Sequence, residues 1–118
     1  MTIDLKNNEI FWCDKTFKRV THRPISTSFK EIEVLKNGNI LVLEEGFKYS
    51  NNNKSNLYCL NRNMELIWYL DTPNNNHWHL DLYVGFSIYG EELFANSFSC
   101  NRVHFTEYGQ ILNTWFTK

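Results

Sequence analysis

Short apolar segments separated by polar turn residues run along most of this chain. Ile32–Leu35 and Ile40–Leu43 are two such segments, and Lys36-Asn37-Gly38-Asn39 joins them. Asn-Gly between two β-rich segments is the strongest short-range signal for a β-hairpin. No long window shows the apolar spacing of an amphipathic helix. The pattern therefore predicts an all-β chain, with at most a helical turn near residues 26–31.

Strand-like segments continue to the end of the chain, and both prolines fall in expected connections. The further strands are expected at residues 57–60, 65–70, 78–84, 92–95, 102–105 and 110–115. A length of 118 residues suits one domain and leaves no room for a second, so we expect one domain that spans residues 1–118.

Parts of this strand pattern repeat. Ile10–Val20 aligns with Leu57–Ile67 at an offset of 47 residues, and the latter aligns with Arg102–Leu112 at an offset of 45. Each unit is a strand, a polar turn and a second strand. Another hairpin lies in each interval, at Ile32–Leu43 and at Leu82–Ala95. About four strands in each such period is the size of a β-propeller blade.

Three short motifs carry a resemblance to a known family. They are Asn37–Val42 (NGNILV), Asn56–Asn61 (NLYCLN) followed by Leu66-Ile67-Trp68, and the turn and strand Glu107–Leu112. They resemble the blade repeats of quinoprotein-type β-propellers, in which this pattern is structural and implies no quinone. Closed propellers have four or more blades, and this chain supplies only about two and a half. We therefore expect an antiparallel meander of blade-like repeats, closed as a sandwich or barrel or left as a partial propeller.

Composition and charge exclude several classes of protein. Hydrophobic residues make up 42% of the 118 residues, which is too many for a disordered chain. Twelve basic residues against thirteen acidic ones give a net charge of −1, which disfavours general nucleic-acid binding. There is no apolar segment of bilayer-spanning length, and the first residues lack the features of a signal peptide. We therefore expect a cytoplasmic protein that binds neither nucleic acid nor membrane.

Charge is unevenly distributed along the chain. Residues 63–101 contain five acidic residues and no lysine or arginine. If their loops cluster, they form an acidic region that attracts a cationic partner. Aromatic side chains in the same stretch are suitable anchors for a protein interface. Chance combined with a need for solubility is the alternative explanation.

The densest polar cluster lies in residues 77–84. At a period of two, one strand face carries His77, His79, Asp81 and Tyr83, and the other carries Trp78, Leu80, Leu82 and Val84. The His-x-His spacing resembles that of cupins and would suit a metal ion with Asp81 as a third ligand. The glutamate that cupins place shortly afterwards is missing. A solvated strand face and a partner-facing surface are the alternatives.

No sequence motif of an enzyme is present. The chain has no phosphate-binding glycine loop and no GxSxG elbow, and it contains only five glycines. Its three cysteines, Cys13, Cys59 and Cys100, lack the spacing of a zinc cluster and are expected to pack as small apolar side chains in strands. We therefore expect a protein that is not an enzyme and holds no cofactor or metal ion.

These expectations favour a small protein that binds another protein. In general type the chain resembles the immunity proteins of contact-dependent growth inhibition, which neutralise a cognate bacterial toxin, often a nuclease. Its partner would be a toxin with a basic surface, covered by acidic loops. The expected contacts are Asp71, His77, His79, Asp81, Glu91 and Glu92 by charge and Tyr83 by its ring. Two alternatives stay open: a propeller-repeat domain that assembles into a homo-oligomer, and a metal-dependent enzyme built on His77 and His79.

Overall fold

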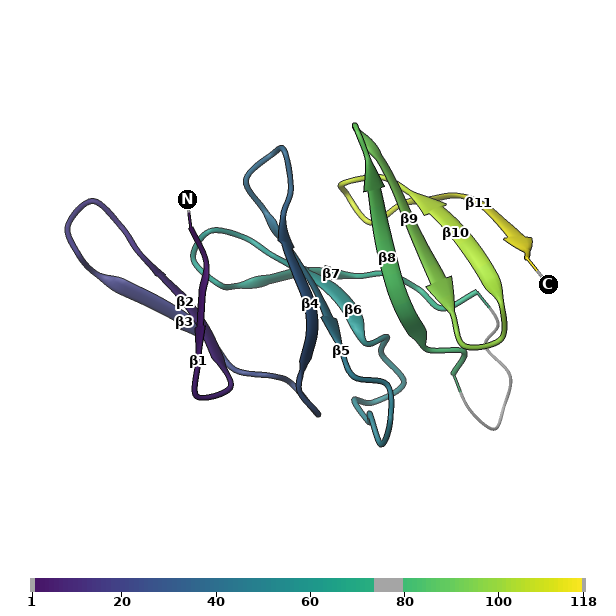
Figure 1. Cartoon of the computed structure of the whole chain (residues 1–118), viewed down its shortest axis with the longest axis horizontal. Helices are drawn as coiled ribbons and strands as arrows, with labels where there is room; N and C mark the ends of the chain where they lie inside the picture. Colours follow the sequence, from purple (N-terminus) through teal and green to yellow (C-terminus); the bar gives the residue numbers. More distant parts are fainter. Residues whose placement is uncertain (1, 74–79, 118) are drawn as a thin grey trace.

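The computed structural model describes residues 2–73 and 80–117, which contain eleven β-strands and no helix (Figure 1). The first sheet comprises β1 (Asp4–Lys6), β2 (Glu9–Cys13) and β3 (Arg19–His22). The second comprises β4 (Phe29–Val34), β5 (Ile40–Glu44), β6 (Leu57–Leu60) and β7 (Leu66–Tyr69). The third comprises β8 (Tyr83–Tyr89), β9 (Glu92–Ser97), β10 (Asn101–Phe105) and β11 (Ile111–Phe116). The all-β prediction is confirmed.

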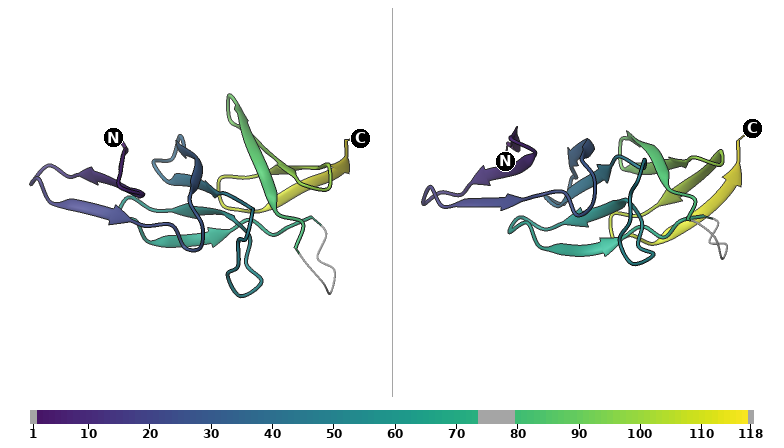
Figure 2. Two further views of the ribbon diagram at one scale, coloured as in Figure 1. Left: turned by 60° about the horizontal axis from the view of Figure 1, so that its bottom comes forward. Right: turned by 90° about the horizontal axis from the view of Figure 1, so that it is seen from below.

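Each sheet is an antiparallel meander in which strands that follow one another in the chain lie side by side. The three sheets succeed one another along the longest axis of the molecule (Figures 1 and 2). No strand of one sheet pairs with a strand of another in the described residues, so they form no closed barrel. The helical turn that the sequence allowed near residues 26–31 does not form, and β4 begins at Phe29. No helix suited to crossing a membrane occurs in the described part of the chain.

The core lies on both faces of the second sheet. Every residue of β5 and β6 is buried, because side chains of alternate residues face opposite neighbouring sheets. Ile40 and Val42 pack toward the first sheet, in a cluster that includes Ile10. Leu41 and Leu43 pack toward the third sheet. This double burial explains why these strands are continuous apolar segments in the sequence.

The hairpin expected at residues 36–39 is confirmed as the β4–β5 turn. The amide of Leu35 donates to the carbonyl of Asn39 at 2.7 Å, and the Asn37 side chain accepts the amide of Asn39 at 2.9 Å. Gly38 has a φ of +89°, a region that residues with a Cβ rarely adopt. The turn therefore needs a glycine at the position where the sequence has one.

The aligned segments of the sequence form turns with one backbone conformation. Asp14, Asn61 and Thr106 begin these turns, and the side chain of each accepts the amides two and four residues further on. The residue three positions after each has a positive φ, and these residues are Phe17 (62°), Met64 (62°) and Gly109 (79°). The β2–β3, β6–β7 and β10–β11 turns are thus structural equivalents, one in each sheet.

Candidate partner-binding groove

An open groove of about 1120 Å³ lies between the second and third sheets. One wall is β4 with the turn that leads into β5. The other wall comes from β8, the β8–β9 hairpin and the β10–β11 turn. Leu35, Leu93 and Phe105 line it from the buried cluster that joins the two sheets. The groove therefore has an apolar floor fixed by the core.

Most charged residues along this groove are acidic. Five glutamates line it against one lysine, and these are Glu31, Glu33, Glu91, Glu92, Glu107 and Lys36. Two of them come from β4, where Glu31 and Glu33 alternate with Ile32. Because Ile32 packs toward the first sheet, its two neighbours face the third. The alternation of β4 thus places two carboxylates on the groove wall.

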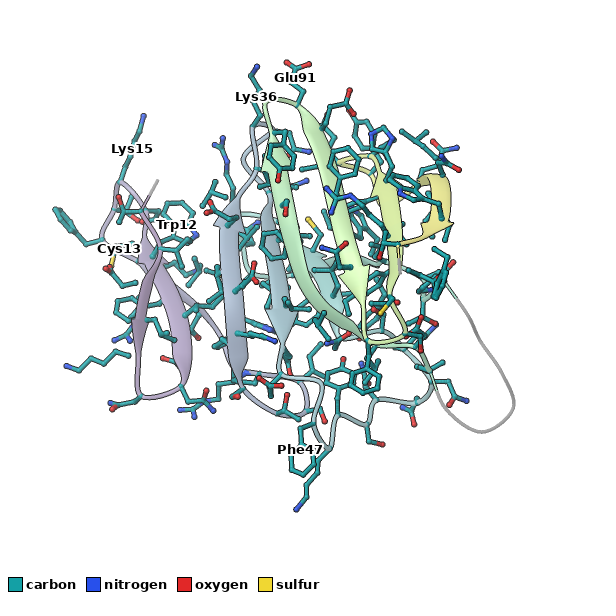
Figure 3. All side chains as sticks on the ribbon, turned by 45° about the vertical axis from the view of Figure 1, so that its right-hand side comes forward. Trp12, Cys13, Lys15, Lys36, Phe47 and Glu91 are labelled. Carbon is teal, nitrogen blue, oxygen red and sulfur yellow. The ribbon has the colours of Figure 1, made fainter. Side chains whose placement is uncertain are left out.

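An ion pair bridges the two walls at the rim. The ammonium group of Lys36 lies 2.7 Å from the Glu91 carboxylate, and Figure 3 shows the two side chains meeting above the sheets. This hydrogen bond raises the pKa of Lys36 and lowers the pKa of Glu91. Both side chains are largely exposed, so the pair contributes little to stability. Both groups stay accessible to a partner.

A second acidic residue of the β8–β9 hairpin is held by a histidine. The His104 ring bonds through Nε2 to the Glu92 carboxylate. The same ring stacks on Phe94, with centroids 4.7 Å apart. No ion pair of Glu31, Glu33 or Glu107 is found in the described ranges. These three are the groove acids with the least internal compensation.

The structure places the expected contact residues in different environments. Glu91 and Glu92 line the groove. Asp71 is exposed after β7, away from the groove lining, and its carbonyl accepts the Tyr83 hydroxyl at 2.6 Å. His77 and His79 lie outside the described residues. The metal site that was considered at this His-x-His pair therefore lies outside them too. The expectation of partner contacts at these residues stays a prediction.

Asp81 and Tyr83 lie in the interior instead of on a surface face. Their exposed fractions are 4% and 1%, whereas Val84, expected on the opposite strand face, is 40% exposed. The face assignment failed because it assumed a strand at residues 78–84, whereas β8 begins at Tyr83. We therefore leave Asp81 and Tyr83 out of the contact surface.

Asp81 instead organises the β9–β10 turn. Its carboxylate accepts the Ser97 hydroxyl at 2.6 Å, the Ser99 amide at 2.8 Å and the Asn101 side chain at 3.0 Å. Burial by itself raises the pKa of Asp81, but these hydrogen bonds outweigh it and hold that pKa below its usual value. The hydrogen bonds of this turn therefore stabilise the charged form of Asp81.

Sequence reasoning missed three of the groove residues. The acidic region expected from the sequence comprised residues 63–101, whereas Glu31, Glu33 and Glu107 lie outside that stretch. The motif Glu31-Ile32-Glu33 was the available signal, because two acids two residues apart share one face of a strand.

The cysteines and the possible metal ligands of the described residues form no cluster. In the described ranges, no group of three His, Cys, Asp or Glu side chains could hold a metal ion. Cys59 is buried, which raises its pKa to about 12. Cys13 and Cys100 are exposed, so the expectation that all three pack in strands is wrong for these two.

No protein-family model matches the sequence, and a search of curated proteins finds no significant match.

Proposed function

We propose that this chain is a small binding protein that receives a cationic segment of a partner protein in the acidic groove. In its most specific form it is an immunity protein that neutralises a cognate bacterial toxin in the cytoplasm. One concave surface carries five glutamates and only one lysine, and this observation carries the proposal. Acids gathered in a cleft with apolar walls focus the field and speed the approach of a cation.

The shape of the groove decides what kind of segment it suits. A concave site takes a projecting loop or side chain, and the apolar floor at Leu35 and Phe105 supports the aliphatic stem of a lysine or arginine. Glu31 and Glu33 lie on one wall and Glu107 on the other, so that a basic head group can contact both. The Lys36–Glu91 pair at the rim can open and offer Glu91 to the partner, at little energetic cost because it is exposed.

Such binding would inhibit a nuclease without any catalytic step. A nuclease holds its substrate through basic residues that contact phosphate groups. A basic loop that is engaged in the groove no longer contacts the nucleic acid. The bulk of the immunity protein then keeps the substrate out of the cleft.

We also propose that the three sheets are blades of an incomplete β-propeller. The equivalent turns at Asp14, Asn61 and Thr106, one in each sheet, support this description. An incomplete propeller of three sheets, of which the first has three strands, leaves its end sheets without a neighbour. The alternative function, a self-assembling repeat domain, depends on what covers those end sheets.

The test is co-expression with the protein encoded by the neighbouring upstream reading frame. We expect that protein to kill cells alone, and this chain to rescue them and to co-purify with it. The double substitution Glu31→Gln and Glu33→Gln is expected to weaken the complex about 10-fold and to reduce its salt dependence. Isothermal titration calorimetry at two salt concentrations measures both effects.

The matched control is the double substitution Glu45→Gln and Glu65→Gln. It changes the net charge equally at two exposed acids outside the groove, and the affinity is expected to stay within about 2-fold. Equal losses from the two double variants would show that only net charge matters and would reject the groove as the contact. A harmless neighbouring protein that does not bind would reject the immunity function.

A further inference from the structure

Each of the first two sheets places a tryptophan against the equivalent turn of the next sheet. Trp12 on β2 donates its indole N–H to the carbonyl of Arg62 at 2.6 Å, in the β6–β7 turn. Trp68 on β7 donates its indole N–H to the carbonyl of Glu107 at 3.2 Å, in the β10–β11 turn. Arg62 and Glu107 both follow directly after the residue that begins the turn. The contact between successive sheets is therefore repeated, in the same direction along the chain.

These contacts cover the positive-φ residue of each turn. Met64 is only 7% exposed in the cluster that also packs against Trp12. At Gly109, an added Cβ would lie 2.5 Å from the Trp68 ring. The equivalent residue of the first sheet is Phe17, and it is 87% exposed. The first sheet thus presents the same turn without the cover that the other two turns have.

The third sheet carries a face equivalent to the one from which Trp68 contacts the next turn. His104 and Asn113 pair across β10 and β11 as Cys59 and Trp68 pair across β6 and β7. Trp115 lies two residues further along the same face of β11.

The face around Trp115 is aromatic and partly exposed. The Trp115 ring contacts the ring of Phe94, with centroids 6.3 Å apart, and is 38% exposed. The guanidinium of Arg102 lies over the same Phe94 ring. This is the face that Trp68 uses in the second sheet, and none of the three sheets in the described residues packs over it.

The two free ends carry opposite charge. Residues 2–23, which form the first sheet and its turns, contain five basic residues and three acidic ones. Residues 81–117, which form the third sheet and its turns, contain four acidic residues and one basic one. The ends lie at opposite extremes of the molecule in Figure 1, and Figure 3 shows Lys15 projecting from the tip of the uncovered turn. Like ends therefore repel each other and unlike ends attract.

We propose that a second copy of this chain covers both ends. The outward face of the third sheet, with Phe94 and Trp115, packs on the Asp14–Lys18 turn of the other copy, as Trp68 packs on the turn at Gly109. The same contact forms twice, because each copy has one end of each kind. A repeated head-to-tail contact closes when the rotation allows it, and two copies of three sheets form a ring of six, a number found in closed propellers.

The test is sedimentation velocity on the full chain over a range of concentrations. Wild type is expected to sediment as a dimer. Phe17→Asn removes the ring from the uncovered turn and is expected to weaken the dimer at least 10-fold, and asparagine tolerates the positive φ, so folding is preserved. Trp115→Ala is expected to weaken it similarly. Phe47→Asn is the matched control, because Phe47 is as exposed but lies in the β5–β6 loop, and it leaves the dimer unchanged.

A mixture of the Phe17→Asn and Trp115→Ala variants distinguishes head-to-tail contact from pairing of like faces. One of the two contacts in a mixed dimer joins two unaltered faces, so the mixture is expected to associate more tightly than either variant alone. A monomeric wild type, an unaffected Phe17→Asn variant or growth into longer oligomers would each overturn the closed pair. None of these substitutions lies in the groove. Toxin binding can therefore fail while the dimer persists, and the dimer can fail while toxin binding persists.

Discussion

A buried carboxylate shows how single residues hold this fold together. Glu44, at the end of β5, has no exposed surface. It accepts the backbone amides of Ile25, Ser26 and Thr27 at 2.7 to 3.0 Å. It also accepts the Tyr58 hydroxyl at 2.5 Å. Four donors compensate for the lost hydration of the charge, so Glu44 anchors the segment that joins the first sheet to the second.

This network extends to His22 at the end of β3. Because the only proton of the Tyr58 hydroxyl goes to Glu44, the hydroxyl accepts at its other side, and His22 donates to it through Nε2 at 2.8 Å. Burial lowers the pKa of His22 more than the Glu44 charge raises it. Burial thus favours the neutral ring, and the bond to Tyr58 favours its Nε2–H form.

We predict that Glu44→Gln lowers the free energy of unfolding by about 2–3 kcal/mol. The amide keeps the shape, but its NH₂ group meets backbone donors where the carboxylate accepted them. Urea denaturation measures the change. Glu45→Gln, with an exposed side chain, is the control and is expected to shift stability by less than about 0.5 kcal/mol. Equal stability of the two variants would mean that Glu44 is no anchor.

At the scale of elements, turns and the preceding sheets stabilise each other. The β10–β11 turn has a positive φ at Gly109, and the Trp68 ring lies where a Cβ would be. The β8–β9 hairpin has a positive φ of 64° at Gly90, but no atom lies within 4 Å of an added Cβ there. The two glycines therefore separate backbone strain from loss of packing.

We predict that Gly109→Ala costs about 2–4 kcal/mol and Gly90→Ala only about 1 kcal/mol. Both variants pay for a left-handed backbone, but only the first displaces a packed ring. Thermal unfolding measures stability, and tryptophan fluorescence reports the environment of Trp68. A cost at Gly109 no larger than at Gly90 would contradict the close packing of sheet on turn.

For the whole molecule, Asn56 links two sheets. Its Nδ2 donates to the carbonyls of Glu44 and Tyr83, both at 2.8 Å, and its Oδ1 accepts the Tyr83 amide at 2.9 Å. The side chain is fully buried. One amide thus satisfies backbone groups of the second and third sheets that would otherwise be buried without partners.

We predict that Asn56→Asp costs about 3 kcal/mol or more and uncouples the third sheet. A carboxylate has no proton to donate and would face two carbonyl oxygens. Hydrogen exchange is expected to show faster exchange in β8–β11 than in β5 and β6. Asn63→Asp, at an exposed turn position, is the control and should leave both sheets protected. A uniform loss of protection would show that the sheets unfold as one unit without this link.

Local features of this protein could be predicted from its sequence because local physics decides them. Alternation of apolar and polar residues and the turn residues around Asn37-Gly38 led to the all-β class and the β4–β5 hairpin. The repeat at offsets of 47 and 45 led to the three equivalent turns, since a side-chain acceptor and a positive φ are satisfied within five residues. The start of a strand depends on pairing, and β8 pairs with β9 only from Tyr83, so residues 80–82 of the expected strand at 78–84 lie before it.

The amino-acid sequence by itself determined the all-β class, the β4–β5 hairpin and the three equivalent turns. Only the tertiary structure decided which acids meet, because Glu31, Glu91 and Glu107 are far apart in the chain and reach one groove through the packing of two sheets. It also decided that Asp81 is buried and that Phe17 is not. Charge and hydropathy describe what a residue prefers, whereas burial depends on which other segment packs against it.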